Sequence, residues 1–294
     1  MEQYIQDFIT YLRNIKGASL NTLQAYHHDL KKLQGFLETQ ELDKITNLNE
    51  TGLNSFILFL EKEGLSPSSV SRNIASIKAF TLYLLKKGIL KEDPAERIKA
   101  PKIQKKTPQI IKTSLVEKLL NQPDTKTKKG IRDKAMLELL YATGMKASEI
   151  ISLRISDINL KARIIICNEK KERVIPFGKS ANQALQTYLD IRCKEPAIQT
   201  EEDSDILFLN SSGQKLSRQG FWKIIKSYAD MAGIENINPS SIRHSFAAHL
   251  IDNGADLESV KEFLGHSDIA TTQMYLTQRN KNAREVYLNT HPRA

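Results

Sequence analysis

Apolar residues in the first hundred positions recur with the period of an amphipathic helix, in four consecutive segments. The apolar stripes of these segments begin at Tyr4, Leu23, Leu53 and Val70. The fourth stripe consists of Val70, Ile74, Ile77, Phe80, Leu82 and Leu85. Four amphipathic helices joined by short polar connections predict a small helical bundle. Taken alone, this periodicity is equally typical of a helical adaptor domain.

Serine, proline and glycine residues mark the expected ends of these helices. Ser19 and Ser66 stand where a hydroxyl caps the first turn of a helix. Pro67 then occupies the first helical position, where the missing N–H of proline has no intrahelical partner to lose. Gly17 and Gly88 are the expected stops after the first and fourth helices.

Beyond residue 110, the pattern predicts a mainly α domain with one small antiparallel β-sheet. A capping box is expected at Thr113–Glu117, where a hydroxyl precedes a glutamate by three residues. Two β-branched runs, Arg163–Cys167 and Arg173–Phe177, flank a polar turn and predict a hairpin. Ser156–Asn159 is expected to form a turn. The other helices are expected at residues 131–142, 146–153, 180–192, 217–232, 240–253, 257–264, 269–275 and after 280.

The stretch between residues 93 and 109 interrupts the helical pattern, because it contains prolines and few large apolar residues. We therefore divide the chain into an N-terminal helical domain (1–92), a basic linker (93–109) and a C-terminal domain (110–294). The lysines of the linker are Lys99, Lys102, Lys105 and Lys106. This charge suits a strap that passes beside DNA, although an ordinary solvated linker has the same composition.

The composition favours a protein that binds nucleic acid without excluding others. The 294 residues carry a formal net charge of +9, with acidic and basic groups interspersed. A mild basic excess of this kind suits a nucleic-acid groove better than a disordered tail. The two cysteines, Cys167 and Cys193, give no disulfide framework, and Cys167 is expected to be buried. The acidic start is unlike a signal peptide, and no apolar run reaches the ~20 residues of a membrane span. We therefore expect a cytoplasmic protein with no membrane partner.

The polar side of the fourth helix is a candidate DNA-binding surface. Small hydroxyls and a few cations suit phosphate contacts in a major groove, because they donate hydrogen bonds without bulk. Serines near a helix start are equally explained by capping. The polar residues concerned are Ser68, Ser69, Ser71, Arg72, Asn73, Ser76 and Lys78.

Three residues suited to phosphate chemistry lie in the last part of the sequence. They are Arg243, His266 directly after a glycine, and Tyr275 in a polar setting. The motifs at residues 141–150, 171–176, 243–250, 264–267 and 270–275 together resemble the tyrosine recombinase family. The resemblance is closest to the bacterial Xer type and covers essentially the whole chain, since the N-terminal bundle is similar to the family's core-binding domain.

The resemblance implies DNA strand exchange without metal, nucleotide or other cofactor. It places Tyr275 at the nucleophile, which forms a 3′-phosphotyrosine and frees a 5′-hydroxyl. Arg243 falls on the second of two phosphate-clamping arginines, and His266 on the histidine that hydrogen-bonds the scissile phosphate. For His244 and His249, packing or support of the site is expected instead.

Such a reaction makes physical demands that can be stated independently of the resemblance. Charge gathers on the phosphate oxygens in the transition state, so guanidinium groups are needed nearby. A tyrosine with a pKa of about 10 must lose its proton to become a good nucleophile. The departing 5′-oxygen needs a general acid.

The sequence departs from the family's pattern at three positions. Lys146 stands where the first arginine is expected, which keeps the charge but loses the bidentate fork. Asn168 replaces the hairpin lysine that serves as the acid. Lys170 and Lys171 lie in the same turn, and Lys170 is the better candidate of the two because period-two spacing returns it to the face of Asn168. Ser240 replaces a histidine and cannot act as a base near pH 7. Its other expected role is to cap the helix that begins at Ser241.

These departures leave three hypotheses open: a working recombinase of reduced activity, a DNA-binding homologue without efficient cleavage, and a helical adaptor unrelated to DNA. The resemblance further implies a tetramer on double-stranded DNA with a specific recombination site, in which the tail after Asn280 docks on a neighbour. The biological role that the resemblance implies is chromosome dimer resolution at cell division, with a second recombinase and a septal DNA translocase as partners. A mobile-element integrase is the alternative role for the same chemistry.

Overall fold

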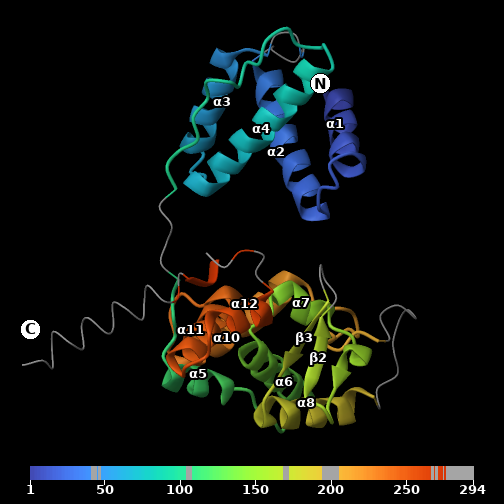
Figure 1. The fold of residues 1–294 in the computed structure, drawn as a ribbon, viewed down its shortest axis with the longest axis vertical. Helices are drawn as coiled ribbons and strands as arrows, with labels where there is room; N and C mark the ends of the chain where they lie inside the picture. The colour runs from blue at the N-terminus through green and yellow to red at the C-terminus, as the bar shows by residue number, and fades with distance from the viewer. Residues whose placement is uncertain are drawn as a thin grey trace, which may run out of the picture. The chain divides into compact units, whose positions relative to one another are not determined.

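The structure of the chain is a computed structural model. It describes residues 1–40, 45, 48–103, 108–167, 172–193, 205–265, 268, 271–273 and 275. The chain separates into two compact units, Met1–Lys106 and Thr107–Ala294 (Figure 1). Within the described residues, no helix is both long enough and apolar enough to cross a membrane.

The first unit is the expected four-helix bundle. Its helices are α1 (Glu2–Asn14), α2 (Leu20–Thr39), α3 (Glu50–Lys62) and α4 (Pro67–Lys86). Ser19 and Ser66 cap α2 and α4 through their hydroxyls, and Pro67 opens α4, as predicted. One prediction about the apolar face of α4 is wrong, because Leu82 is 44% exposed.

Two residues of the polar side of α4, Asn73 and Ser76, lie inside the bundle and not on the surface expected to contact DNA. Asn73 and Ser76 are buried and donate hydrogen bonds to carbonyls of their own helix. Arg72 reaches the buried Asp29 on α2, with 2.9 Å between nitrogen and oxygen. Burial raises the pKa of Asp29 even though Arg72 opposes the effect. Lys78 donates to a carbonyl oxygen, that of Glu96, at 3.2 Å. Arg72 therefore ties α4 to α2, and Lys78 ties α4 to the segment that follows it.

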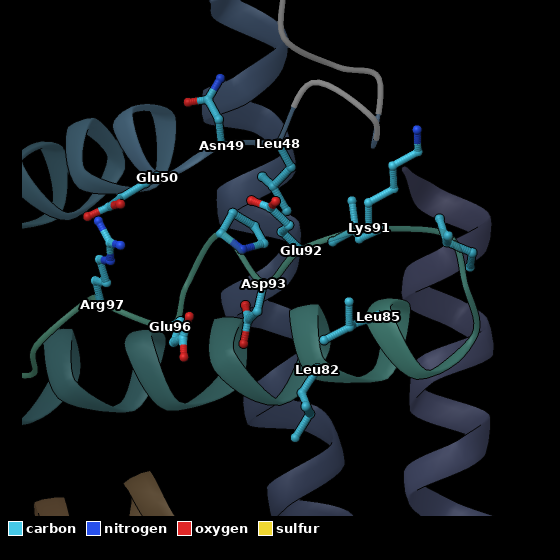
Figure 2. Close-up of a pocket in the computed structure, with 13 residues that line it drawn as sticks. Leu48, Asn49, Glu50, Leu82, Leu85, Lys91, Glu92, Asp93, Glu96 and Arg97 are labelled. Atoms are coloured by element: carbon cyan, nitrogen blue, oxygen red, sulfur yellow. The ribbon is translucent and has the colours of Figure 1, made fainter.

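A pocket of about 940 Å³ lies in the first unit, between the start of α3, the end of α4 and the segment that follows it (Figure 2). Its lining carries four carboxylates, at Glu50, Glu92, Asp93 and Glu96, and two cations, at Lys91 and Arg97. The net charge of this lining is negative, which disfavours phosphate. The pocket also contains none of the candidate site residues, so it is not a candidate for the phosphate chemistry.

The second unit is mainly α with a small antiparallel sheet, as predicted. α6 is buried along most of its length, and it packs most extensively against α8 and α11 (Figure 1). The helices are α5 (Thr113–Leu120), α6 (Lys128–Thr143), α7 (Ala147–Ser152), α8 (Lys179–Arg192), α10 (Arg218–Ala232), α11 (Pro239–Asp252) and α12 (Leu257–Leu264).

The sheet confirms the predicted hairpin and adds a strand to it. β2 (Ile164–Cys167) pairs antiparallel with β3 (Arg173–Pro176) and with β1 (Ile158–Asn159). The expectation of a turn at residues 156–159 is therefore only partly right. A strand of two residues is too short to show an alternating pattern. Cys167 is buried, as expected.

Two predicted caps are wrong for the same reason, a misplaced helix start. α5 already begins at Thr113, so its cap position is Lys112, and no side-chain cap forms. α11 begins at Pro239 and is capped by Asn238, whose side chain accepts from the N–H of Ser241. Ser240 lies inside the first turn and is exposed, so it does not cap this helix.

Candidate active site

The buried guanidinium of Arg243 joins the ends of two other helices. Arg243 is 8% exposed on α11 and donates to the carbonyl oxygens of Gly144 (2.7 Å) and Leu264 (2.6 Å). These carbonyls end α6 and α12, where helix carbonyls lack intrahelical partners and carry partial negative charge. Burial lowers the pKa of Arg243, and the charge of Glu149 opposes this effect. Arginine nevertheless remains a cation at neutral pH.

Gly144 allows α6 to end against α11. Its φ of +58° places it in the left-handed region, where residues with a Cβ are strained. A Cβ at this position would lie 2.3 Å from Cδ1 of Phe246. Glycine therefore provides both the turn and the close approach that bring this carbonyl to Arg243.

Glu149 is the buried anion of the site. It is 2% exposed and accepts from the guanidinium of Arg173 and from the backbone N–H of Lys146, each at 2.7 Å. Burial by itself would raise the pKa of this carboxyl, but the two hydrogen bonds and the charges of Arg173 and Lys146 together outweigh burial, and the net pKa is lowered. Glu149 is therefore ionised at neutral pH, and it ties β3 to the start of α7.

Arg173 connects the same corner to the end of α12. Its Nε donates to the carbonyl oxygen of Phe263 at 3.3 Å. Its side chain lies so close to Gly265 that a Cβ there would meet Nη1 at 2.8 Å. Gly265 ends α12 in the left-handed conformation, as the sequence suggested. The residue after this glycine, His266, lies outside the described residues.

Lys146 is placed beside this buried network and is much more accessible. It occupies the cap position of α7, and its side chain is 41% exposed. Its ammonium lies 3.4 Å from an oxygen of Glu149. The charge of Glu149 thus acts on both Lys146 and Arg243. The structure brings the two predicted phosphate cations to one corner of the unit.

Tyr275 is buried with its hydroxyl bonded to a histidine. The residue is 2% exposed, and its hydroxyl oxygen lies 2.6 Å from Nδ1 of His244. Burial raises the pKa of Tyr275, and the charge of Arg243 opposes this effect. Burial also lowers the pKa of His244, and Arg243 lowers it further. Both groups are therefore neutral near pH 7.

A second pair on α11 repeats this geometry away from the cations. Nδ1 of His249 lies 2.8 Å from the hydroxyl of Tyr141 on α6, and the two rings meet edge to face. Burial lowers the pKa of His249 and raises that of Tyr141. The sequence led to the same expectation of packing or support for His244 and His249. The structure separates them, since only His244 contacts Tyr275.

Several predicted residues cannot be located in the site. Asn168 and Lys170 in the hairpin turn, and the linker residues Lys105 and Lys106, lie outside the described residues. Lys102 is exposed in the described part of the linker. Among the described residues, no group of three or more His, Cys, Asp or Glu side chains is arranged to hold a metal ion.

Sequence reasoning missed two residues of the site, Glu149 and Arg173, and it did not distinguish His244 from His249. Glu149 and Arg173 lie within motifs that carried the resemblance, but charged residues in helices and strands are usually solvated. The spacing of Lys146 and Glu149 at the start of α7 is the one local signal, because such a pair closes a first helical turn. For His244, adjacency to Arg243 was the available signal.

Two family models match the chain. The Phage integrase family matches residues 109–282, and the N-terminal SAM-like domain of phage integrases matches residues 5–88. Among curated relatives, the tyrosine recombinase XerD of Listeria monocytogenes is 43% identical over 298 residues, covering all of both chains. The XerD protein of Oceanobacillus iheyensis is 40% identical over 301 residues, again covering all of both chains.

Solved structures share the fold at lower identity. The XerH site-specific recombinase bound to palindromic difH substrate has a TM-score of 0.74 and 22% identity, covering 96% of this chain and 84% of that one. A lambda integrase dimer bound to a COC′ core site has a TM-score of 0.71 and 14% identity, covering 94% of each chain.

Proposed function

The chain belongs to the phage integrase family and is a site-specific tyrosine recombinase, and from this we propose that it cleaves and rejoins DNA through Tyr275. The observation that carries the proposal is the convergence of Arg243, Lys146 and Tyr275 in one corner of the second unit. Arg243 binds Gly144 and acts electrostatically on Tyr275, while Lys146 lies two residues beyond Gly144. A phosphate bound by the two cations is thereby held close to the tyrosine.

In the proposed reaction, the oxygen of Tyr275 attacks the scissile phosphorus and the bond to the 5′-oxygen breaks. The product is a 3′-phosphotyrosine and a free 5′-hydroxyl, which attacks the phosphotyrosine of a partner strand in the reverse chemistry. The covalent link keeps the energy of the phosphodiester, so no nucleotide is consumed. Lys170 is the proposed donor of the proton to the 5′-oxygen, because Asn168 cannot supply one.

The cations have different roles in this proposal. Two of the five N–H donors of Arg243 bind helix-end carbonyls, which fixes the guanidinium plane. The remaining donors of Arg243 are those we assign to a phosphate oxygen. Lys146 contributes a point charge that a phosphate approaches from solvent. His266 is the proposed third donor, and Ser240, exposed one turn before Arg243, contributes a hydroxyl at most.

The proposed substrate is double-stranded DNA with a specific recombination site. The relatives named XerD cover the whole chain, which supports an Xer-type role in chromosome dimer resolution over a mobile-element role. The proposed assembly is a tetramer on two sites, with a second recombinase and a septal DNA translocase as further partners. The basic residues assigned to DNA contacts are Arg72, Lys78, Lys102, Lys105 and Lys106.

The proposal is tested by covalent trapping on a suicide duplex. The substrate is a duplex that this protein selects from a random pool by binding, nicked next to the scissile phosphate so that the product strand diffuses away. The wild-type chain is expected to form a protein–DNA adduct that survives denaturation. Tyr275→Phe should form none, while the control Tyr141→Phe, which removes a partly buried phenol that also bonds to a histidine of α11, should still form it.

A second candidate, a DNA-binding homologue without efficient cleavage, is favoured by Lys146 in place of the expected arginine. A wild-type protein that shifts the duplex in a gel but never forms an adduct would establish that candidate and refute cleavage. The combined substitution Lys146→Arg, Asn168→Lys and Ser240→His then measures how much the three departures lower the rate of adduct formation. An adduct that appears only in this variant shows that the pocket geometry is intact and that the altered groups limit the reaction.

A further inference from the structure

We propose that His244 is the proton acceptor for Tyr275, and that it supplies the base which Ser240 cannot provide. This inference rests on the proposed function, since it assigns a further catalytic residue to the same reaction. It depends on a contact between two helices of the second unit that the sequence did not reveal. Tyr275 lies 31 residues after His244, yet the two side chains share a hydrogen bond.

The geometry of the contact suits direct proton transfer. The hydroxyl oxygen of Tyr275 and Nδ1 of His244 are 2.6 Å apart, at the short end of the distances over which a proton passes between heavy atoms. The rings are tilted by 50° with centroids 5.8 Å apart, so the contact is made by the polar edges and not by stacked faces. For the nitrogen to accept, the neutral imidazole must carry its proton on Nε2.

The surroundings keep His244 in the form that accepts a proton. In the described part of the chain, the charged and titratable groups acting on it are Arg243 on α11 and Tyr275 from the opposing segment. Burial lowers the pKa of His244 first, and the Arg243 cation lowers it further. At neutral pH the imidazole is therefore uncharged. The same arginine stabilises the phenolate that forms when the proton leaves, because it opposes the rise in the pKa of Tyr275.

Every proton that moves in this reaction is given and taken by a residue of the proposed site or by the DNA. On cleavage, the Tyr275 O–P bond forms, the phenolic proton moves to Nδ1 of His244, and the P–O5′ bond breaks while Lys170 gives the 5′-oxygen a proton. On rejoining, the 5′-hydroxyl attacks phosphorus and returns its proton to Lys170. The imidazolium of His244 returns its proton to Tyr275 as that oxygen departs. No oxidant, reductant or metal is needed.

The pair formed by His249 and Tyr141 is an internal control for this assignment. It lies on the same helix, it has an Nδ1-to-hydroxyl distance of 2.8 Å, and burial shifts both of its pKa values in the same directions. The Arg243 charge is not among the causes of either shift. If a buried histidine–tyrosine bond on α11 matters only for packing, substitutions of His244 and His249 should have equal effects.

The experiment compares His244→Asn with His249→Asn in the full chain, using single-turnover adduct formation on the nicked duplex. Asparagine places a hydrogen-bonding amide near the former Nδ1 but cannot accept a proton. His244→Asn is expected to slow adduct formation by about 10²–10⁴-fold, the usual range for loss of a general base. His249→Asn is expected to change the rate by less than about tenfold. Thermal unfolding and DNA binding of both variants are measured in parallel.

The pH profile and the leaving group separate a base from a merely structural residue. The rate of wild-type cleavage should decrease at acidic pH, because His244 becomes protonated. The rate of His244→Asn should not show this decrease and should instead increase towards high pH, because the phenolate of Tyr275 forms there. On a duplex whose scissile 5′-oxygen is replaced by sulfur, the leaving thiolate needs no proton. This substrate should restore cleavage by Lys170→Ala but not by His244→Asn.

Three outcomes overturn the inference. One is adduct formation by His244→Asn at the wild-type rate and with the wild-type pH profile. Another is faster adduct formation, which would show that the contact holds Tyr275 back. The third needs no variant: a wild-type rate that does not fall at acidic pH would show that no group titrating like His244 accepts the proton. Absence of any adduct from wild type on either substrate would instead refute the proposed function itself.

Discussion

Arg243 and Lys146 are the two cations to which we assign a phosphate, and the protein holds them in opposite ways. Arg243 is 8% exposed, and its guanidinium bonds to the carbonyls that end α6 and α12. The side chain of Lys146 is 41% exposed at the start of α7, with its ammonium beside Glu149. One cation is part of the core, and the other lies at its rim.

The difference explains which of the two positions tolerates a change of side chain. Replacing a buried guanidinium leaves helix-end carbonyls without donors, so any change at residue 243 disturbs the fold as well as the chemistry. A side chain at residue 146 points largely into solvent, and lysine keeps the charge there. We therefore expect the departure at Lys146 to affect the phosphate contact while leaving the structure nearly unchanged.

The largest effect is expected for Arg243→Ala. Loss of two charge-assisted hydrogen bonds to buried carbonyls should lower the free energy of unfolding by about 3–5 kcal/mol. Adduct formation should fall by at least about 10²–10³-fold, as for loss of one transition-state donor. Urea unfolding and suicide-duplex trapping measure the two effects. A variant as stable as wild type would show that Arg243 does not hold the helix ends together.

Next in size is the effect of Glu149→Gln, which removes the anion shared by both cations. Arg173 would be left nearly buried without a charged partner, so the free energy of unfolding should fall by about 3 kcal/mol. The control Glu172→Gln alters an exposed neighbour and should change it by less than about 0.5 kcal/mol. Equal effects of the two substitutions would contradict the structural role assigned to Glu149.

The same residue predicts a pH dependence. The folded-state pKa of Glu149 lies below its ordinary value of 4.5, so the ionised form is stabilised by folding. Its contribution is fully present above about pH 4.5 and is lost as the pH falls through the lowered folded value. Wild type should therefore lose more unfolding free energy than Glu149→Gln when urea titrations are repeated at decreasing pH.

A smaller effect is expected where α6 turns towards Lys146. Gly144→Ala and Gly233→Ala both place a Cβ on a left-handed residue that ends a helix, but only the first meets a side chain, Phe246. Gly233→Ala should cost about 1 kcal/mol of unfolding free energy. Gly144→Ala should cost about 1 kcal/mol more than that, because α11 must move away. Equal losses of unfolding free energy for the two substitutions would mean that the Phe246 side chain moves aside with little loss of stability.

The smallest effect on stability is expected for Lys146→Arg, at less than about 0.5 kcal/mol. A planar guanidinium donates two parallel hydrogen bonds to a phosphate, so the rate of cleavage should rise. We expect a rise of about tenfold, which corresponds to about 1.4 kcal/mol of added transition-state binding. Thermal unfolding and adduct kinetics provide the two readouts. A large loss of stability would show that the lysine is as constrained as Arg243.

Much of the fold could be predicted from the sequence because its signals are local. Ser19 and Ser66 set helix starts through hydrogen bonds within one turn, and Pro67 does so through its fixed φ. Gly144 and Gly265 end helices through their own backbone freedom. Leu82 was wrongly assigned to the apolar face of α4, because helical periodicity does not show how much of a helix surface the neighbouring elements cover. Asn238 was overlooked as a cap because the start of α11 was placed too late.

The site was only partly predictable, because its contacts join residues far apart in the chain. Motif order was enough to single out Arg243 and Tyr275, but no local pattern says that Arg173 reaches Glu149 across 24 positions. Likewise, helical spacing gave His244 and His249 the same expected role. Only the three-dimensional contacts distinguish the histidine that bonds Tyr275 from the one that bonds Tyr141.

Identification of the residue that carries the DNA is the most direct test of cleavage through Tyr275. The wild-type adduct from the suicide duplex would be digested with protease and nuclease, and the nucleotide-linked peptide sequenced by mass spectrometry. We expect the modification on Tyr275, through a phosphodiester to the 3′-oxygen of the cleaved strand. A modification on any other residue, or a DNA-bound protein without any covalent link, would contradict the proposal.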